Sequence, residues 1–325
     1  MRTLVTGGAG FIGAALVERL LAEGHTVDVA DNLSTGSLLN LADARATAGR
    51  DLTFHQVDVR SSDVTELIVK RQPDVVWHLA AHGDHAAAIA HPGAQAHTDV
   101  VGSLFVLEGV RAAPTRKLVF ASSSVVYGEG GDRALTESHP RRPMSPGAVA
   151  KHTVDAYLAV YAELEAVPFT SLVLANVYGP RASAGVVASW AECLAAGRPC
   201  TVFGDGSQVR DFVFIDDVVD ALARSADRGD GMVLNVGTGT GTGLGALHAA
   251  MVEIAGRLSG PSPDDRGPPL GLRQVAARAG EPHSLVLDPA RAADALEWSP
   301  WTSLGEGLEV VIGAALRGAS RGRHH

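Results

Sequence analysis

The first half of the chain alternates short runs of β-branched and other apolar residues with longer segments whose apolar positions recur every three or four residues. The short runs predict strands, and the longer segments predict helices such as Phe11–Ala22 and Ala94–Arg111. The predicted strands are Thr3–Thr6, Thr26–Ala30, Leu52–Gln56, Val75–Leu79, Lys117–Ala121 and Thr170–Leu174. Strands separated by crossover helices favour a parallel, doubly wound sheet, so we predict an α/β fold of the Rossmann type.

The pattern becomes irregular after about Tyr178. A Gly/Thr alternation runs from Gly237 to Gly243, and a Pro-rich stretch covers residues 260–270. Segments of this kind usually carry recognition loops. We therefore predict a dinucleotide-binding domain over residues 1–177 and a smaller C-terminal α/β substrate-binding domain over residues 178–320, with the chain crossing back between the two.

Composition narrows the class of protein. The 325 residues are 46% apolar and 19% charged, which excludes a disordered, charge-rich chain. Two sparse cysteines, Cys193 and Cys200, predict reduced thiols and a cytoplasmic location. The net charge of −9 disfavours nucleic acid and anionic membrane as partners. No apolar run reaches the roughly 18 residues of a membrane span, and the apolar run near the N-terminus is too short for a signal peptide.

Gly7, Gly10 and Gly13 form a GxxGxxG turn directly after the first predicted strand and directly before an apolar helix. Glycines there permit a tight turn and close approach of the backbone, and the helix N-terminus offers free N–H groups to a pyrophosphate. A glycine-rich turn without a ligand is the alternative. The acidic residue that ends the second predicted strand favours a dinucleotide.

That acidic residue is Asp31, which lies 18 residues after Gly13. Its carboxylate can accept hydrogen bonds from an adenosine ribose and would repel a 2′-phosphate, which favours NAD over NADP. Asp58 closes the third strand, where it can reach the adenine, although it could equally cap the next helix.

Several short motifs occur in a single order along the chain. They are Thr6-Gly-Gly-Ala-Gly-Phe-Ile-Gly13, Asp31-Asn32, His78-Leu-Ala-Ala81, Ser122-Ser-Ser-Val-Val-Tyr-Gly128, Asn176-Val-Tyr-Gly-Pro180 and Arg210-Asp-Phe212. From Arg2 to about Leu308 the chain resembles the extended short-chain dehydrogenase/reductases that act on nucleotide sugars, above all the UDP-sugar 4-epimerases. The resemblance implies a tightly held NAD that removes a hydride from a sugar carbon and returns it.

The resemblance also implies roles for individual residues. Ser123 would hydrogen-bond the reacting sugar hydroxyl, and Lys151 would hold the nicotinamide ribose and supply positive charge. The implied cofactor-binding residues are Gly7, Gly10, Phe11, Ile12, Gly13, Asp31, Asn32, Asp58, Val59, Leu79, Ala80, Ala81 and Lys151. The implied substrate-binding residues are Ser123, Ser124, Asn176, Val186, Val187, Arg210 and Arg278. Arginines suit a diphosphate because their N–H donors neutralise it, although Arg278 could also be a surface residue.

One residue departs from the family's pattern at the catalytic centre. The family places an acid/base tyrosine four residues before the lysine on one helix, and here that position is Gly147. The four tyrosines of the chain all lie elsewhere: Tyr127, Tyr157, Tyr161 and Tyr178. Another group could have taken over the proton transfer, a water could fill the space, or the chain could be a binding-competent variant, natural or engineered.

Asp99 is a second departure, because the family has Asn there. An ionised carboxylate accepts hydrogen bonds but cannot donate them, so either the hydrogen bonds behind Lys151 are arranged differently or Asp99 pairs with a nearby cation. A local role on the helix surface is the alternative.

Histidines are the best substitutes for the tyrosine. His82 and His85 follow the fourth predicted strand, at the sheet edge where such folds bind ligands, and imidazole titrates near neutral pH. They could equally be polar loop residues that contact the substrate. Five histidines between His78 and His97 raise the question of a metal, but we predict none because the spacing does not resemble a closed zinc site.

The residues after Ser123 discriminate among reactions. The family's 4,6-dehydratases place Asp-Glu there and its decarboxylases carry a glutamate nearby, whereas here Ser124-Val125 follows. The sequence therefore predicts C4 epimerisation of a UDP-hexose or UDP-hexuronate, with a catalytically silent nucleotide-sugar binder as the alternative. The family's dimer helices correspond to Ala94–Arg111 and Lys151–Glu165, which predicts a homodimer.

Overall fold

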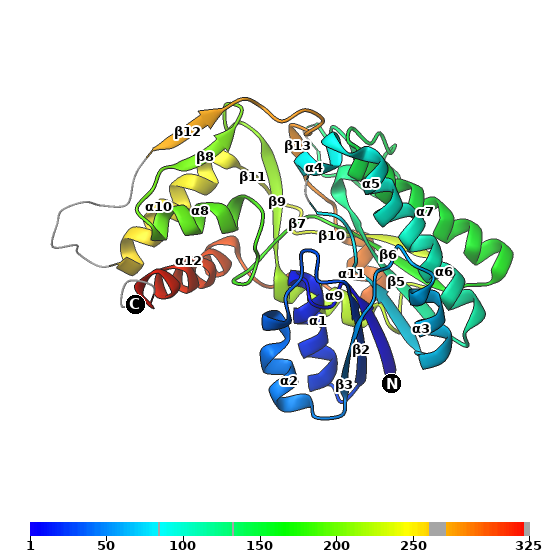
Figure 1. Ribbon diagram of the computed structural model, residues 1–325. Coiled ribbons are helices and arrows are strands. Elements are labelled where there is room, and N and C mark those ends of the chain that lie inside the picture. The colour runs from blue at the N-terminus through cyan, green and yellow to red at the C-terminus, as the bar shows by residue number, and fades with distance from the viewer. Residues whose placement is uncertain (84, 132, 260–270, 322–325) are drawn as a thin grey trace.

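The computed structural model describes residues 1–83, 85–131, 133–259 and 271–321 (Figure 1). The Pro-rich stretch that we predicted as a recognition loop, residues 260–270, lies outside the described residues, and so does Asp84. No helix in the described ranges is long and apolar enough to cross a membrane.

A seven-stranded parallel sheet forms the larger layer of the molecule (Figure 1). Its order is β10-β6-β5-β4-β1-β2-β3, which reverses between β4 and β1 as in a doubly wound fold. The strands are β1 (Arg2–Thr6), β2 (Thr26–Asp31), β3 (Leu52–Gln56), β4 (Val75–His78), β5 (Lys117–Ser123), β6 (Phe169–Leu174) and β10 (Met232–Val236). The predicted Rossmann-type fold is confirmed, and six of these strands match the predicted ones to within two residues at either end.

Helices cover both faces of this sheet, which is why its strands read as nearly continuous apolar runs. One hydrophobic cluster joins the sheet to α1 (Phe11–Ala22) and α9 (Ile215–Arg224). A second cluster joins the opposite face to α3 (Asp63–Arg71), α6 (Gly102–Ala112) and α7 (Pro146–Glu165). The shorter helical segments are η1 (Leu38–Leu41), α2 (Ala42–Ala48), α4 (His85–Ala90), η3 (Ser124–Tyr127) and α11 (Ala290–Leu296).

The segment Ala94–Arg111 is helical along its whole length, as predicted, but it is not one regular α-helix. The structure has α5 (Pro92–Ala96), a π-helical turn over His97–Val101 and then α6. Turns of this kind are rare and often lie at functional sites. Here the turn contains Asp99, whose side chain is buried against the sheet edge.

A smaller unit lies above and to the left of the large sheet in Figure 1. Its strands are β7 (Asn176–Tyr178), β8 (Cys200–Phe203), β9 (Val209–Phe214), β11 (Gly241–Gly243), β12 (Leu272–Val275) and β13 (Ser284–Leu285). Its helices are α8 (Val186–Ala195), α10 (Leu244–Ser259) and α12 (Leu304–Arg321). β10 also comes from the C-terminal half of the chain yet extends the large sheet. The boundary at residue 177 stays a prediction.

Both cysteines are free thiols. Cys200 is buried in β8, and burial raises the pKa of its thiol to about 11. A thiol in such surroundings stays protonated and unreactive near neutral pH.

Candidate functional site

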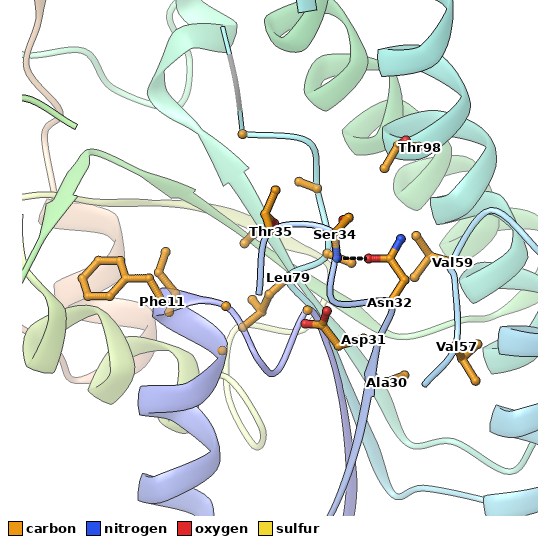
Figure 2. A pocket seen from close by; sticks show the side chains of 18 residues that line it. Phe11, Ala30, Asp31, Asn32, Ser34, Thr35, Val57, Val59, Leu79 and Thr98 are labelled. Carbon is orange, nitrogen blue, oxygen red and sulfur yellow. Dashed lines mark hydrogen bonds between the residues drawn. The ribbon is translucent and has the colours of Figure 1, made fainter. Parts of the chain in front are cut away.

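A cavity of about 290 Å³ opens at the carboxyl ends of β1, β2, β4 and β5 (Figure 2). Such an edge is where parallel α/β sheets bind ligands. Eleven predicted cofactor-binding residues line it: Gly7, Gly10, Phe11, Ile12, Gly13, Asp31, Asn32, Val59, Leu79, Ala80 and Ala81. Other lining residues were not predicted from the sequence, namely Ala30, Ser34, Thr35, Val57, Gly83, Thr98 and Ala121.

The glycine turn at the cavity floor is packed too closely for larger residues. A Cβ on Gly13 would collide with the carbonyl oxygen of Gly7. Gly7 itself has φ of +69°, and a Cβ there would lie 2.7 Å from the backbone nitrogen of Ala80. This cradle brings backbone N–H groups and the start of α1 up to the cavity, as a pyrophosphate requires.

Asp31 is held at the wall of the cavity by the glycine turn and by its own loop (Figure 2). Its Oδ2 accepts a hydrogen bond from the Ala9 N–H at 3.0 Å, and its Oδ1 accepts one from the Leu33 N–H at 2.8 Å. The fixed carboxylate can still accept hydrogen bonds from a ribose diol, and its charge disfavours a phosphate at the same place.

Asp58 does not line the cavity, although its neighbours Val57 and Val59 do. Its carboxylate accepts hydrogen bonds from the Arg60 guanidinium, the shortest at 2.7 Å, and from Asn32 Nδ2 at 2.9 Å. The hydrogen bonds from Arg60 are the main reason that the pKa of Asp58 lies well below its usual range. In this structure Asp58 fixes the loop around Asn32, and its predicted contact with adenine stays a prediction.

Lys151 contacts β5, the strand that ends at Ser123. The Nζ of Lys151 donates to the carbonyl oxygen of Ala121 at 2.7 Å and lies 4.6 Å from the centroid of the Phe120 ring. Ser123 is two residues after Ala121 on the same strand, so the two share one face of the sheet. Ala121 lines the cavity, so Lys151 contacts a residue of its wall, although Lys151 and Ser123 are not themselves among the lining residues.

Buried surroundings lower the pKa of Lys151, since they penalise the ammonium more than the neutral amine. The negative charges of Asp99 and Asp155 act in the opposite direction. Both carboxylates are almost fully buried, Asp99 at 3% exposure and Asp155 at 5%.

Asp155 joins three segments of the chain behind Lys151, and it was not predicted from the sequence. It accepts hydrogen bonds from Ser122 Oγ at 2.8 Å, Ser171 Oγ at 2.5 Å and the Arg141 guanidinium at 2.5 Å. Its position four residues after Lys151 on one helix face is a signal that could have identified it.

Gly147 lies in the first turn of α7, after the N-cap Ser145. A Cβ on Gly147 would lie 3.4 Å from the Nε2 of Gln95, which is ordinary van der Waals contact. Gln95, another residue that was not predicted, is 2% exposed and donates from Nε2 to Asp99 Oδ2 at 2.6 Å and to the His82 carbonyl at 3.2 Å.

The two candidate histidines have other contacts in the structure. His82 donates its backbone N–H to Asp99 Oδ1 at 2.8 Å. His85 Nε2 lies 3.0 Å from the carbonyl oxygen of Ala279, in the loop after β12. Their roles as acid/base groups stay hypotheses, and over the described residues no group of three or more His, Cys, Asp or Glu side chains could hold a metal ion.

His78 is buried between two hydroxyls. Its Nδ1 lies 2.7 Å from Thr6 Oγ1 and its Nε2 lies 2.8 Å from Ser103 Oγ. Burial lowers its pKa to about 3, so the ring is neutral at physiological pH.

A second cavity, of about 190 Å³, lies in the smaller unit between α8 and β8. Val186 and Arg278 line it, and the Arg278 guanidinium stacks 3.8 Å from the centroid of the Phe203 ring. Val187 is buried in α8, and Ser124 is buried at the start of η3. Asn176 lies on β7, paired in register with Phe212 of β9.

Arg210, predicted to bind the diphosphate of the substrate, is buried, with 5% of its surface exposed. Its guanidinium donates to the carbonyl oxygens of Val209 and His283, both at 2.9 Å, and to that of Pro282 at 2.7 Å. A further contact at 3.2 Å joins it to Glu281. In this structure Arg210 supports the loop that carries Glu281, and its contact with a diphosphate stays a prediction.

Comparison with known proteins places the site in a family. The model of the NAD dependent epimerase/dehydratase family matches residues 3–237. UDP-glucose 4-epimerase of Mycolicibacterium smegmatis is 41% identical over 96% of this chain and 97% of that protein. A dTDP-glucose 4,6-dehydratase of Xanthomonas campestris is 32% identical over 95% of this chain and 91% of its own.

Solved structures agree with the sequence relatives. UDP-glucose 4-epimerase of Thermotoga maritima with UDP-glucose superposes with a TM-score of 0.88, at 33% identity and full coverage of both chains. The Thermus thermophilus UDP-glucose 4-epimerase in complex with NAD gives 0.87, at 35% identity, covering 98% of this chain and all of the other. With a glycine cradle and Asp31 that fit a dinucleotide, the chain belongs to the NAD-dependent epimerase/dehydratase family of extended short-chain dehydrogenase/reductases, and its cofactor is NAD.

Proposed function

We propose that the protein epimerises a nucleotide sugar, a UDP-hexose or UDP-hexuronate, at C4 through a transient 4-keto intermediate. The observation that carries this proposal is the hydrogen bond from Lys151 Nζ to the carbonyl of Ala121, a residue that lines the dinucleotide cavity and lies on the strand that carries Ser123. Bound NAD supplies a hydride acceptor that returns the hydride to the same carbon. The residues of the chain bind, orient and move protons around that exchange.

Several predicted residues have a task in this proposal. The glycine turn and α1 bind the pyrophosphate, Asp31 binds the adenosine ribose, and Lys151 holds the nicotinamide ribose. Ser123 orients the C4 hydroxyl. The nucleotide diphosphate occupies the second cavity, where Arg278 is already present and can turn from Phe203 to a phosphate.

Elimination reactions are disfavoured by the residues next to Ser123. A dehydratase needs a general acid that expels water, and here Ser124 is buried while Val125 packs against the hydrophobic cluster. Epimerisation needs no such acid, because the hydride leaves, the keto-sugar turns over and the hydride returns. The relatives named 4-epimerases support this choice over the one named a dehydratase.

A catalytically silent nucleotide-sugar binder is the second candidate, and Gly147 is the observation that favours it. Loss of a positioned acid/base group costs about 10²–10⁴-fold in rate but leaves the binding residues in place. Sustained turnover of any defined UDP- or dTDP-sugar would exclude this candidate. If Gly147 instead replaces the tyrosine of an active epimerase by engineering, the protein should turn over the sugar slowly, and Gly147→Tyr should accelerate this turnover.

The glycine cradle gives a test of cofactor binding. Gly13→Ala should weaken NAD binding by roughly tenfold or more, because its Cβ collides with the Gly7 carbonyl and the turn must shift. Isothermal titration with NAD measures the effect. Gly245→Ala, near the start of α10 where a Cβ meets nothing within 4 Å, is the matched control and should bind NAD as the unmodified protein does. Equal affinities for both variants would remove the cradle from the cofactor site.

The outer face of α7 supports a homodimer as part of the proposal. Val149, Tyr157, Val160 and Leu164 expose large apolar side chains there, and Leu164 is 73% exposed. Apolar surface of this kind marks protein interfaces. Val160→Asp should therefore shift the protein from dimer to monomer in light scattering, whereas Val69→Asp, at a comparably exposed position on α3, should not. A monomeric unmodified protein would contradict the proposal of a homodimer.

A cytoplasmic location of the protein stays a prediction.

A further inference from the structure

The ammonium of Lys151 has few partners for a group with three N–H donors. Within the part of the chain that the structure describes, its Nζ has one hydrogen-bond acceptor, the Ala121 carbonyl, and the face of the Phe120 ring. A buried charge with so few partners is costly, and a buried lysine readily becomes a neutral amine. A neutral Lys151 can keep its bond to Ala121 and present a lone pair toward the cavity.

Three titratable groups face Lys151 from the elements around it. His78 on β4 is neutral. Asp155, on the helix of Lys151 itself, is committed to the Arg141 guanidinium and two serine hydroxyls. Asp99, on the π-helical turn, is fixed by the His82 N–H and by Gln95 Nε2, and no Lys or Arg in the described ranges forms an ion pair with it. Asp99 is therefore the carboxylate free to balance a charge that Lys151 acquires.

Gly147 leaves the lysine open to the substrate. It lies one helical turn before Lys151, so the two residues share a face of α7. Glycine places no side chain on that face of the helix. The side chain nearest to a Cβ at Gly147 is that of Gln95, whose Nε2 already donates to Asp99 and to the His82 carbonyl. Of the residues predicted to be catalytic, this leaves the Lys151 amine and the Ser123 hydroxyl to exchange a proton.

We propose that Lys151, with Asp99 as its counter-charge, takes the place of the missing tyrosine and exchanges the proton of the sugar's C4 hydroxyl. This inference rests on the proposed function. The hydroxyl O–H bond breaks and its proton joins the neutral Lys151 amine while the C4 hydride passes to NAD, so that C4 becomes a ketone. After the keto-sugar turns over, the hydride returns to C4 and the Lys151 ammonium gives its proton back to the oxygen. Asp99 is a positioning residue that stabilises the ammonium between the two steps.

Lys151→Arg tests whether Lys151 acts as a proton acceptor or only as a positive charge. A guanidinium keeps the charge but does not deprotonate in a protein, so it cannot accept the proton. The measurement is the rate at which bound NAD becomes NADH after mixing with UDP-sugar, with NAD affinity measured alongside. We expect Lys151→Arg to lower this rate about a hundredfold or more, the range of a positioned acid/base group. The double variant Lys151→Arg with Gly147→Tyr should form NADH at least about tenfold faster than Lys151→Arg alone, because a phenol can then accept the proton. A Lys151→Arg rate within tenfold of the unmodified protein, or no recovery in the double variant, would overturn the proposal.

Asp99→Asn tests the counter-charge through the pH profile of the same rate. Only the neutral amine accepts a proton, so the rate rises with pH through the pKa of Lys151. Removing a nearby negative charge lowers that pKa, so the rising limb should move about one pH unit toward lower pH. A limb that stays in place, or moves to higher pH, would show that Lys151 is not the group that titrates. The NAD affinity of the variant checks that the site is still folded.

Failure of this inference is distinguishable from failure of the proposed function. If NADH forms but neither Lys151→Arg nor Asp99→Asn affects it as stated, another group moves the proton and the epimerase proposal stands. If neither the unmodified protein nor the Gly147→Tyr variant reduces its NAD with any UDP-sugar, both proposals fail.

Discussion

Gly147→Tyr should raise the rate of C4 epimerisation by about tenfold, which is less than the full 10²–10⁴-fold contribution of a positioned general acid/base group because Lys151 already exchanges part of the protons. The position accepts a side chain, because a Cβ there meets only Gln95 Nε2 at 3.4 Å. The phenol would lie on the face of α7 that carries Lys151, whose charge lowers the pKa of a neighbouring phenol. NMR of the interconverting sugars measures the rate.

Gly147→Phe is the matched control for this change. It adds the same ring without the hydroxyl, so it should fill the space and leave the rate at or below that of the unmodified protein. An equal gain from Tyr and Phe would assign the effect to packing. An unchanged rate with Tyr would mean that another group already moves the proton at full efficiency.

Asp155→Ala should lower the free energy of unfolding by about 3–5 kcal/mol, because it leaves the Arg141 guanidinium buried without its partner. The side chain of Arg141 is only 15% exposed, so water cannot replace the carboxylate easily. The hydroxyls of Ser122 and Ser171 lose the same acceptor. Urea denaturation monitored by tryptophan fluorescence measures the change.

Glu23→Ala provides the comparison for a surface ion pair. Glu23 pairs with Arg19 at 2.5 Å, but the two side chains are 35% and 40% exposed. Exposed pairs contribute under about 1 kcal/mol. If both variants lose the same small amount, Asp155 does not hold β5, β6 and α7 together.

The sequence predicted the sheet well where both faces of a strand are buried. β4 (Val75–His78) and β6 (Phe169–Leu174) are buried at every position and read as mainly apolar runs, whereas the edge strand β3 (Leu52–Gln56) is only partly buried. β10 was not predicted from the sequence, because the polar residue Asn235 interrupts its run of apolar residues. Asn235 is fully buried, yet its amide is satisfied by Tyr127 Oη at 2.7 Å and the Leu135 carbonyl at 2.7 Å, partners about 100 residues away. Apolar patterning cannot show such contacts.

The pattern of apolar and polar residues also did not predict the local backbone geometry and side-chain contacts at the site. Around the π-helical turn the buried positions include the polar residues Gln95, Asp99 and Ser103, so the apolar pattern did not predict the turn. The glycine turn and Asp31 were predicted because their spacing along the chain reflects a local structure. The role of Gln95 and the partners of Asp58 were not predicted, because their contacts depend on how separate segments of the chain pack together.

NMR of the unmodified protein with a single UDP-sugar tests C4 epimerisation most directly. Starting from the gluco form or from the galacto form, we expect the same final mixture of the two, with NADH formed only transiently on the enzyme. Protein that binds UDP-sugars yet interconverts no gluco and galacto forms over a day would contradict the proposed function.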